Sequence, residues 1–358
     1  MMIQSTALLL LSLLGVATLP AQTFRPMPTT GGSQFIELPA GRTTIVAPAL
    51  QPPAVAQFAV SLAGVAAGVA TVNLAGAKPL DLGNAPLRDG QYGGRVISHY
   101  AMVTAGDWVG HCLGVKNNTA TSLELWTGDL QAGPRSIRHV EIRPYWTLAS
   151  LLPASVAEVS FVPTTDAAAV KTRVVLSPSG TRGNEQPQDA GQAYYFRASM
   201  GCWVREDAPD VDAGSDRIAP GAYLYLQNGF TGSRPQDLLI AGTSLDAPFR
   251  LLLQSSAAET ALTYFGLPRS LPCRLSKMGW NDSNFTPSLN TSPAGRNDVL
   301  LLDDGFGGVG AAYYRHAGRW YQVGAALPVD PLMAVGSVFA VVKKVGARPG
   351  SFLLNVSP

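Results

Sequence analysis

The chain has 358 residues, and 14% of them are charged, against about 25% in an average soluble domain. Its formal net charge is +2, and the charged residues are scattered, so neither a basic face for nucleic acid nor an acidic tail is indicated. Hydrophobic residues make up 46%, which excludes general disorder, and 37 glycines with 27 prolines favour strands and turns over helices.

An apolar run extends from Ala7 to Leu19 and is followed by the letters PAQ at 20–22. It is too short to span a bilayer comfortably and lies where a secretory signal peptide belongs, the alternative being a buried N-terminal helix. We expect residues 1–21 to be a signal peptide. The mature chain is then exported to the periplasm, the cell surface or the extracellular space, and it has no transmembrane segment.

Short apolar stretches broken by turn residues recur about every ten residues after residue 30, as in all-β modules. The stretch 54–77 alternates apolar residues, turns through glycines and resumes, which predicts a hairpin rather than a membrane helix. Short helices are expected only at 148–152 and 255–264. Further strands are expected at 35–41, 95–103, 122–128, 139–146, 172–177, 221–228 and 337–344.

A similar aromatic string occurs twice, as YYFRASMGCW at 194–203 and as YYRHAGRW at 313–320. Each copy follows an apolar strand, RVVL at 173–176 or DVLL at 298–301, and precedes another strand, YLYL or VFAVV. The string predicts a tight hairpin whose glycine takes a positive φ and whose aromatic side chains lie in the core. The preserved order predicts an internal duplication.

The predicted fold class is mainly β, with tandem small units resembling sandwiches or barrels, an internal duplication and little helix. The predicted segments after the signal peptide are an N-terminal β region at 22–145, a first repeat copy at 146–264 and a second copy at 265–358.

Three phrases point to a family: WVGHCLGVKNNTATSLELWTGDL (108–130), HVEIRPYWTLASLLP (139–153), and NDVLLLDD with the following AAYYRHAGRWYQVG. They resemble an uncharacterised paralogous family of exported bacterial proteins from Verrucomicrobia. The resemblance runs from about residue 35 to the C-terminus, and IRPYWTL is its most specific part. It implies export and β architecture, and it transfers no catalytic residue or cofactor.

The polar segment WNDSNFTPSLNTS contains the candidate ligand-contact residues Trp280, Asn281, Asp282 and Asn284. An exposed Trp ring can stack on the C–H face of a sugar while amides and carboxylates bind its hydroxyls. The alternative is that Trp280 fills a β core.

Other chemistry-bearing residues are dispersed. The histidines, His99, His111, His139 and His316, form no local metal motif, and no G-x-S-x-G motif is present, so a hydrolase would need a dispersed site. The acidic stretch 205–216 fails the EF-hand spacing and is interpreted as a solvated loop. Neither a metal nor a cofactor is predicted. Cys112, Cys202 and Cys273 allow one disulfide or three buried thiols.

These observations favour an exported, non-enzymatic protein of the cell envelope or extracellular space with a structural or adhesive role. The alternative is a carbohydrate-binding protein that uses exposed aromatic residues, with polysaccharide or other envelope components as partners. A hydrolase with a dispersed site is the third option.

Overall fold

A computed structural model shows a mainly β protein, which confirms the predicted fold class. The predicted signal peptide, residues 1–21, lies outside the residues described. These are 31–75, 98–127, 136–156, 161–164, 172–176, 191–229, 236–245, 248–253, 260–306, 308–346 and 350–354, with the single positions 170, 255, 256 and 258.

Six antiparallel strands form a closed barrel in the order β3-β4-β7-β6-β5-β8. Their bounds are β3 (Ala56–Ala66), β4 (Val69–Leu74), β5 (His99–Gly106), β6 (Cys112–Asn118), β7 (Ser122–Trp126) and β8 (Ile137–Pro144). The hairpin predicted within 54–77 is present as β3 and β4, which pair through a tight turn at Ala67 and Gly68.

A second group of strands, the first unit, contains a five-stranded sheet in the order β12-β11-β10-β14-β2 and the two-stranded pairs β1-β15 and β9-β13. Its elements are β1 (Gly31–Leu38), β2 (Arg42–Val46), β9 (Trp146–Thr147), α1 (Leu148–Leu151), β10 (Thr172–Leu176), β11 (Gln192–Arg197), β12 (Cys202–Arg205), β13 (Arg217–Ile218), β14 (Leu224–Asn228) and β15 (Gln236–Thr243).

The remaining strands form the second unit, with a five-stranded sheet in the order β21-β20-β19-β23-β17 and the pairs β16-β24 and β18-β22. Its elements are β16 (Phe249–Leu253), β17 (Ala261–Gly266), β18 (Cys273–Arg274), the 3-10 turns η2 (Leu275–Lys277) and η3 (Pro293–Gly295), β19 (Val299–Asp303), β20 (Val309–His316), β21 (Arg319–Gln322), β22 (Leu332–Met333), β23 (Val338–Lys343) and β24 (Gly350–Leu354).

The two short helices predicted from the sequence have different outcomes. The helix expected at 148–152 is present as α1, where Thr147 caps the first turn through a hydrogen bond from the Ser150 N–H. The helix expected at 255–264 is wrong for residues 261–264, which belong to β17 and pair with β23. Their side chains alternate between the core and solvent, and cross-strand pairing therefore decides their conformation.

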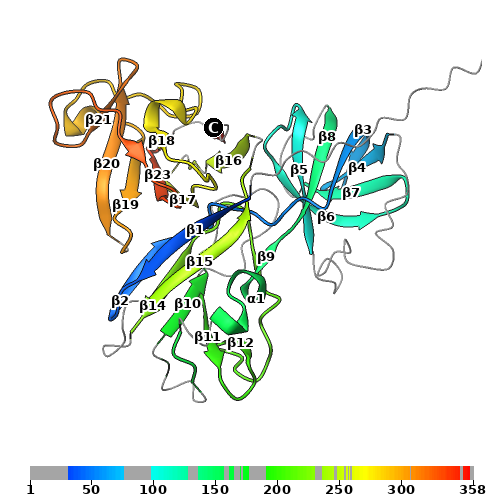
Figure 1. Cartoon of the computed structure of the whole chain (residues 1–358). Coiled ribbons are helices and arrows are strands. Elements are labelled where there is room, and N and C mark those ends of the chain that lie inside the picture. Colours follow the sequence, from blue (N-terminus) through cyan, green and yellow to red (C-terminus); the bar gives the residue numbers. More distant parts are fainter. Residues whose placement is uncertain are drawn as a thin grey trace, which may run out of the picture.

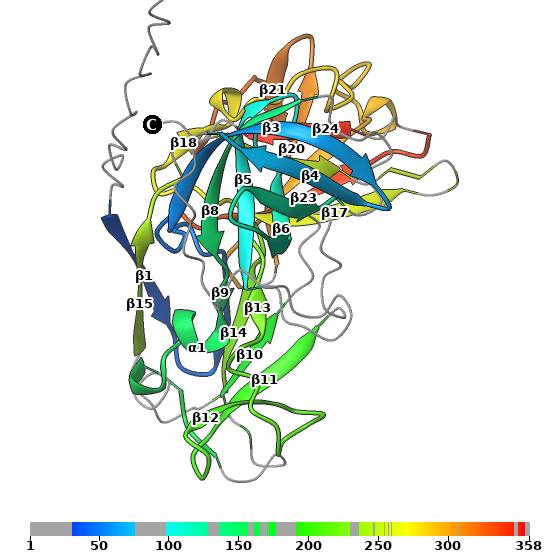
Figure 2. The ribbon, with the colours of Figure 1, turned by 90° about the vertical axis from the view of Figure 1, so that its right-hand side faces the viewer.

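The barrel, the first unit and the second unit occupy three corners of the molecule in Figure 1, and in the view of Figure 2 the barrel lies in front of the second unit. Each has a separate apolar core, but the barrel shares strand β5 with the second unit. Ala101 and Val103 point into the barrel, whereas Tyr100 and Met102 pack into the core of the second unit. Because successive strand residues face opposite sides, β5 is buried on both faces and attaches the barrel to the second unit.

The two units have the same order of strands and the same pairings. The five-stranded sheet of the first unit corresponds to that of the second. The pair β1-β15 corresponds to β16-β24, and the pair β9-β13 corresponds to β18-β22. The barrel occupies the chain between β2 and β9, where the second unit passes from β17 to β18 through residues 267–272. Strand pairing also crosses the predicted segment boundaries, because β2 from 22–145 pairs with β14, and β17 from 146–264 pairs with β23.

Strand register aligns the two units residue by residue. Tyr194 lies opposite Val174 of β10, and Tyr313 lies opposite Leu300 of β19, so both tyrosines occupy the same position in their sheets. Both aromatic strings form hairpins, β11-β12 and β20-β21, and their rings are buried as predicted. The turn glycines have the expected positive φ, 63° for Gly201 and 76° for Gly318.

A buried guanidinium joins the barrel to the first unit within the IRPYW phrase. Arg143 is 2% exposed, and its Nε donates to Glu141 Oε2 at 2.8 Å. Its Nη1 donates to the Pro52 carbonyl at 2.9 Å and to Thr243 Oγ1 at 2.8 Å. One side chain thereby connects β8, the chain that enters the barrel, and β15. The buried charge is compensated by these bonds, as a buried ion requires.

The two units meet at a seam formed by reciprocal backbone hydrogen bonds. The Ala47 N–H donates to the Gly336 carbonyl at 3.2 Å, and the Gly266 N–H donates to the Gly221 carbonyl at 2.8 Å. In the aligned registers Ala47 corresponds to Gly266, and Gly221 corresponds to Gly336. Each unit therefore offers the same donor and acceptor to the other, as in an isologous dimer interface.

We expect Gly266→Ala to lower the free energy of unfolding by about 1–3 kcal/mol, because its added methyl group collides with the methyl group of Ala47 and meets the Ala222 carbonyl at 3.0 Å. Urea unfolding of the purified protein measures this. Gly64→Ala is the matched control, since no atom lies within 4 Å of the added methyl group there. Equal stability of the two variants would contradict close packing at the seam.

Candidate functional site

The predicted ligand-contact segment lies in the second unit, between η2 and β19. Trp280 is only 6% exposed. Its ring centroid lies 5.4 Å from that of Phe285 and 6.4 Å from those of Trp320 and Phe265. Trp280 therefore belongs to the core of the second unit, and the ring has no open face for stacking on a sugar.

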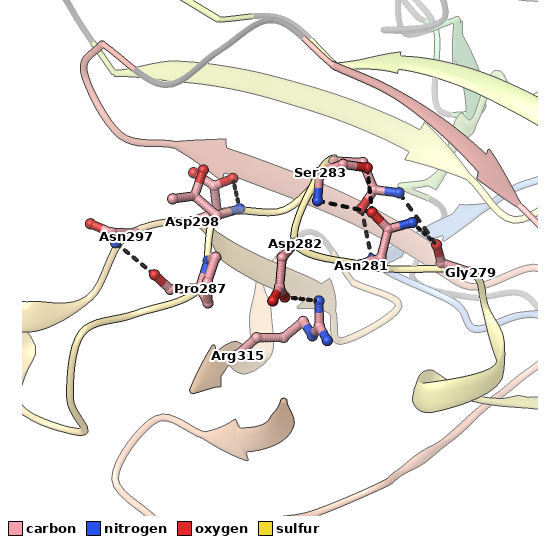
Figure 3. A network of polar contacts seen from close by, with 10 residues as sticks. Gly279, Asn281, Asp282, Ser283, Pro287, Asn297, Asp298 and Arg315 are labelled. Carbon is pink, nitrogen blue, oxygen red and sulfur yellow. Dashed lines mark hydrogen bonds and ion pairs between the residues drawn. The ribbon is translucent and has the colours of Figure 1, made fainter. Parts of the chain in front are cut away.

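The neighbouring amides fold the loop rather than project from it (Figure 3). The Asn284 Oδ1 accepts from the Asn281 N–H at 3.0 Å, and the Asn281 Oδ1 accepts from the Ser283 N–H at 2.9 Å. Both side-chain amides also donate to the Gly279 carbonyl, at 3.4 and 3.3 Å. Asn side chains commonly stabilise turns through such local bonds.

The Asp282 side chain points away from these amides and toward strand β20. Its Oδ1 accepts from Arg315 Nη1 at 2.7 Å, and the carboxylate side chain remains 65% exposed (Figure 3). The Arg315 guanidinium lies 5.9 Å from the centroid of Trp320. The structure therefore brings the candidate residues into one loop, but it orients their polar groups toward each other and toward β20.

A buried ion pair anchors the end of this loop. The Lys343 Nζ donates to Asp298 Oδ2 at 2.7 Å, and both side chains are almost fully buried. The same Oδ2 accepts from the Thr286 N–H at 2.7 Å. The first unit has Thr172 at the equivalent position, where its Oγ1 accepts from the Val162 N–H at 2.7 Å. Both units thus attach a preceding loop through the residue at the start of the central strand.

The three cysteines, the acidic stretch and the histidines are accounted for separately. No disulfide joins the three cysteines. Within 205–216, Asp216 accepts from Tyr194 Oη at 2.9 Å and from Arg205 Nε at 2.8 Å. Burial raises the pKa of Tyr194, and the Asp216 carboxylate raises it further. Among the described residues, no group of three or more His, Cys, Asp and Glu side chains could hold a metal ion.

Each histidine has a local neighbour in the fold. Burial, and secondarily the Arg250 cation, lower the pKa of His111 to about 3, so this ring is neutral at pH 7. Three histidines belong to the barrel and its β5–β6 turn, and one belongs to the second unit. Their neighbours are Ser98 Oγ at 2.9 Å for His99, the Trp108 ring at 5.0 Å for His111, Thr104 Oγ1 at 2.6 Å for His139, and the Ser288 carbonyl at 3.0 Å for His316.

Three tyrosines gather at the seam, where sequence reasoning had not placed a candidate site. Tyr223 is buried, and its ring centroid lies 5.6 Å from that of Tyr225 and 6.1 Å from that of Tyr264. The available signal was the comparison of YLYL with its counterpart VFAVV, which replaces both aromatic residues of that strand. Tyr264 could not be linked to them, because it reaches the cluster from β17.

Comparison with protein-family models, curated proteins and solved structures finds no match. Within the described parts of the chain, no helix combines the length and apolar content needed to cross a membrane.

We expect Trp280→Ala to lower the free energy of unfolding by about 3–5 kcal/mol, because it removes a large buried ring from a packed aromatic cluster. Asp282→Ala, in the same loop, should cost less than about 1 kcal/mol, since its ion pair is exposed on one side. Urea unfolding compares the two variants. A Trp280→Ala protein as stable as Asp282→Ala would contradict the core role.

Asp298→Ala should cost about 3–5 kcal/mol, because it leaves the buried Lys343 ammonium without its partner carboxylate. The double variant Asp298→Thr with Lys343→Asn installs the residues that the first unit uses at these positions, Thr172 and Asn228. It should recover most of the lost stability in the same unfolding assay. A double variant less stable than Asp298→Ala would show that the two units do not share this solution.

Proposed function

We propose that the chain is an exported, non-enzymatic protein of the cell envelope or extracellular space with a structural or adhesive role. The observation that supports the proposal is that charged groups, buried or partly buried, link separate elements of the fold. Arg143 links the barrel to the first unit, Asp298 holds the loop of the second unit, and Asp216 binds Tyr194 and Arg205. Charged groups used in this way stabilise a rigid body.

The proposal includes an internal duplication that produced the two units. Its support is the common strand order, the equivalent positions of Tyr194 and Tyr313, and the reciprocal bonds of the seam. The barrel is then an insertion into the first copy. The two ends of the barrel are neighbours, because Ala56 pairs with Ile142. An insertion at this point therefore leaves β2 and β9 in the same arrangement as their counterparts in the second unit, β17 and β18.

Export and lack of turnover are tested together. We expect the full chain, expressed in a bacterium, to leave the cytoplasm and to begin at Gln22 when its N-terminus is determined by mass spectrometry. The recovered mature protein should release no product from a panel of ester and glycoside substrates.

Retention of uncleaved chain in the cytoplasm would contradict export. A hydrolytic activity that stays with the protein through purification would favour the hydrolase instead. Replacing one of the four histidines by alanine should then abolish that activity.

A further inference from the structure

The seam tyrosines occupy positions that the other unit fills with smaller apolar residues. The aligned registers give three equivalences, which are Tyr264 with Ile45, Tyr223 with Val338, and Tyr225 with Ala340. The second member of each pair is buried, and Ile45 and Val338 belong to the same apolar cluster as Tyr223. Tyr225 lies opposite Ile45, and Tyr264 lies opposite Ala340, so each of these two cross-strand positions has one tyrosine and one smaller residue.

One tyrosine ring from each unit is accessible to solvent. Tyr264, on β17, is 41% exposed, and Tyr225, on β14, is half-buried. Tyr223 lies between them in ring contact with each and is 3% exposed. A buried ring thus supports two accessible ones, which fixes their positions relative to one another across the seam.

The residues beside Tyr225 on the same face of the sheet are polar. Gln227 lies two residues along the same strand, so it faces the same side of the sheet, and Thr43 lies opposite Gln227 on β2. The next strand contributes Arg173, opposite Gln227, and its guanidinium pairs with the Glu206 carboxylate. Amide and hydroxyl groups therefore flank the ring.

This combination fits one class of ligand. Aromatic faces stack on the C–H faces of sugar rings, while neutral amides and hydroxyls exchange hydrogen bonds with sugar hydroxyls. An anionic ligand would instead require unpaired Arg or Lys side chains, and Arg173 is already paired. We propose that Tyr225 and Tyr264 form a contact surface for a neutral polysaccharide; this inference rests on the adhesive role proposed above.

The test is a depletion assay of the mature protein on insoluble polysaccharides, namely cellulose, chitin, β-1,3-glucan and xylan. We expect binding to at least one of them. The variant Tyr225→Ala with Tyr264→Ile carries the residues of the other unit, and its affinity should fall about tenfold or more, the equivalent of about 1.4 kcal/mol. Phe35→Ser, on β1, is the control, because it removes a 66% exposed aromatic ring away from the seam.

Unfolding curves that match the wild type establish that the tyrosine variant is folded. Unchanged binding by this variant, or an equal loss in Phe35→Ser, would place the ligand elsewhere and overturn the inference. Failure of the wild type to bind any of the four polysaccharides would also overturn it. The proposed export and lack of turnover are measured independently, so they survive that result.

Discussion

The architecture depends on one buried guanidinium, that of Arg143, whose N–H groups need hydrogen-bond acceptors within the protein. Arg143 lies where the barrel ends, and its partners come from β8, from the segment that enters the barrel, and from β15. A buried cation that lost any of these partners would carry a large desolvation cost. Arg143 therefore helps to set the relative placement of the barrel and the first unit. The backbone bonds between Gln51 and Thr243, and the bond from Trp146 Nε1 to the Leu50 carbonyl, hold the same region.

The two units share one order of strands but differ in detail. The first unit accepts the barrel between β2 and β9, whereas the second unit supports the barrel through the outer face of β5. Where the second unit uses the charged pair Asp298 and Lys343, the first uses Thr172 and Asn228. Asp298 and Lys343 bond to each other, whereas the Thr172 hydroxyl bonds to the backbone of Val162 and the Asn228 amide donates to the Leu38 carbonyl. The same cross-strand position is therefore polar in both units but is satisfied by different partners.

Local patterns predicted local structure well, because turn residues and alternation act over a few positions. The β3-β4 hairpin and both aromatic hairpins were predictable for this reason. The pairing of β2 with β14 was not predictable, because the whole barrel lies between Val46 and Leu224 in the sequence. The residues 255–264 misled in another way, because their short apolar pattern also suits a helix, and only the partner β23 decides the matter.

The predicted site shows the same limit. Polar neighbours suggested that Trp280 would be exposed, but the asparagines turn the loop with their own side chains while the ring points into the core. The residues were correctly grouped, and their directions could not be predicted, because direction depends on packing against Trp320 from a distant strand. Tyr264 could not be linked to Tyr223 and Tyr225 from the sequence, because it approaches them only when the two units meet.

The position of the barrel in the chain bears on the order of folding. All of its strands lie between residues 56 and 144, so it can close before β14 has left the ribosome. Once Ala56 has paired with Ile142, the effective connection from β2 to β14 is shortened roughly twofold, which lowers the entropy cost of bringing these strands together by about 0.6 kcal/mol. A barrel that closes first thereby brings β2 closer to the strands that follow it in the chain.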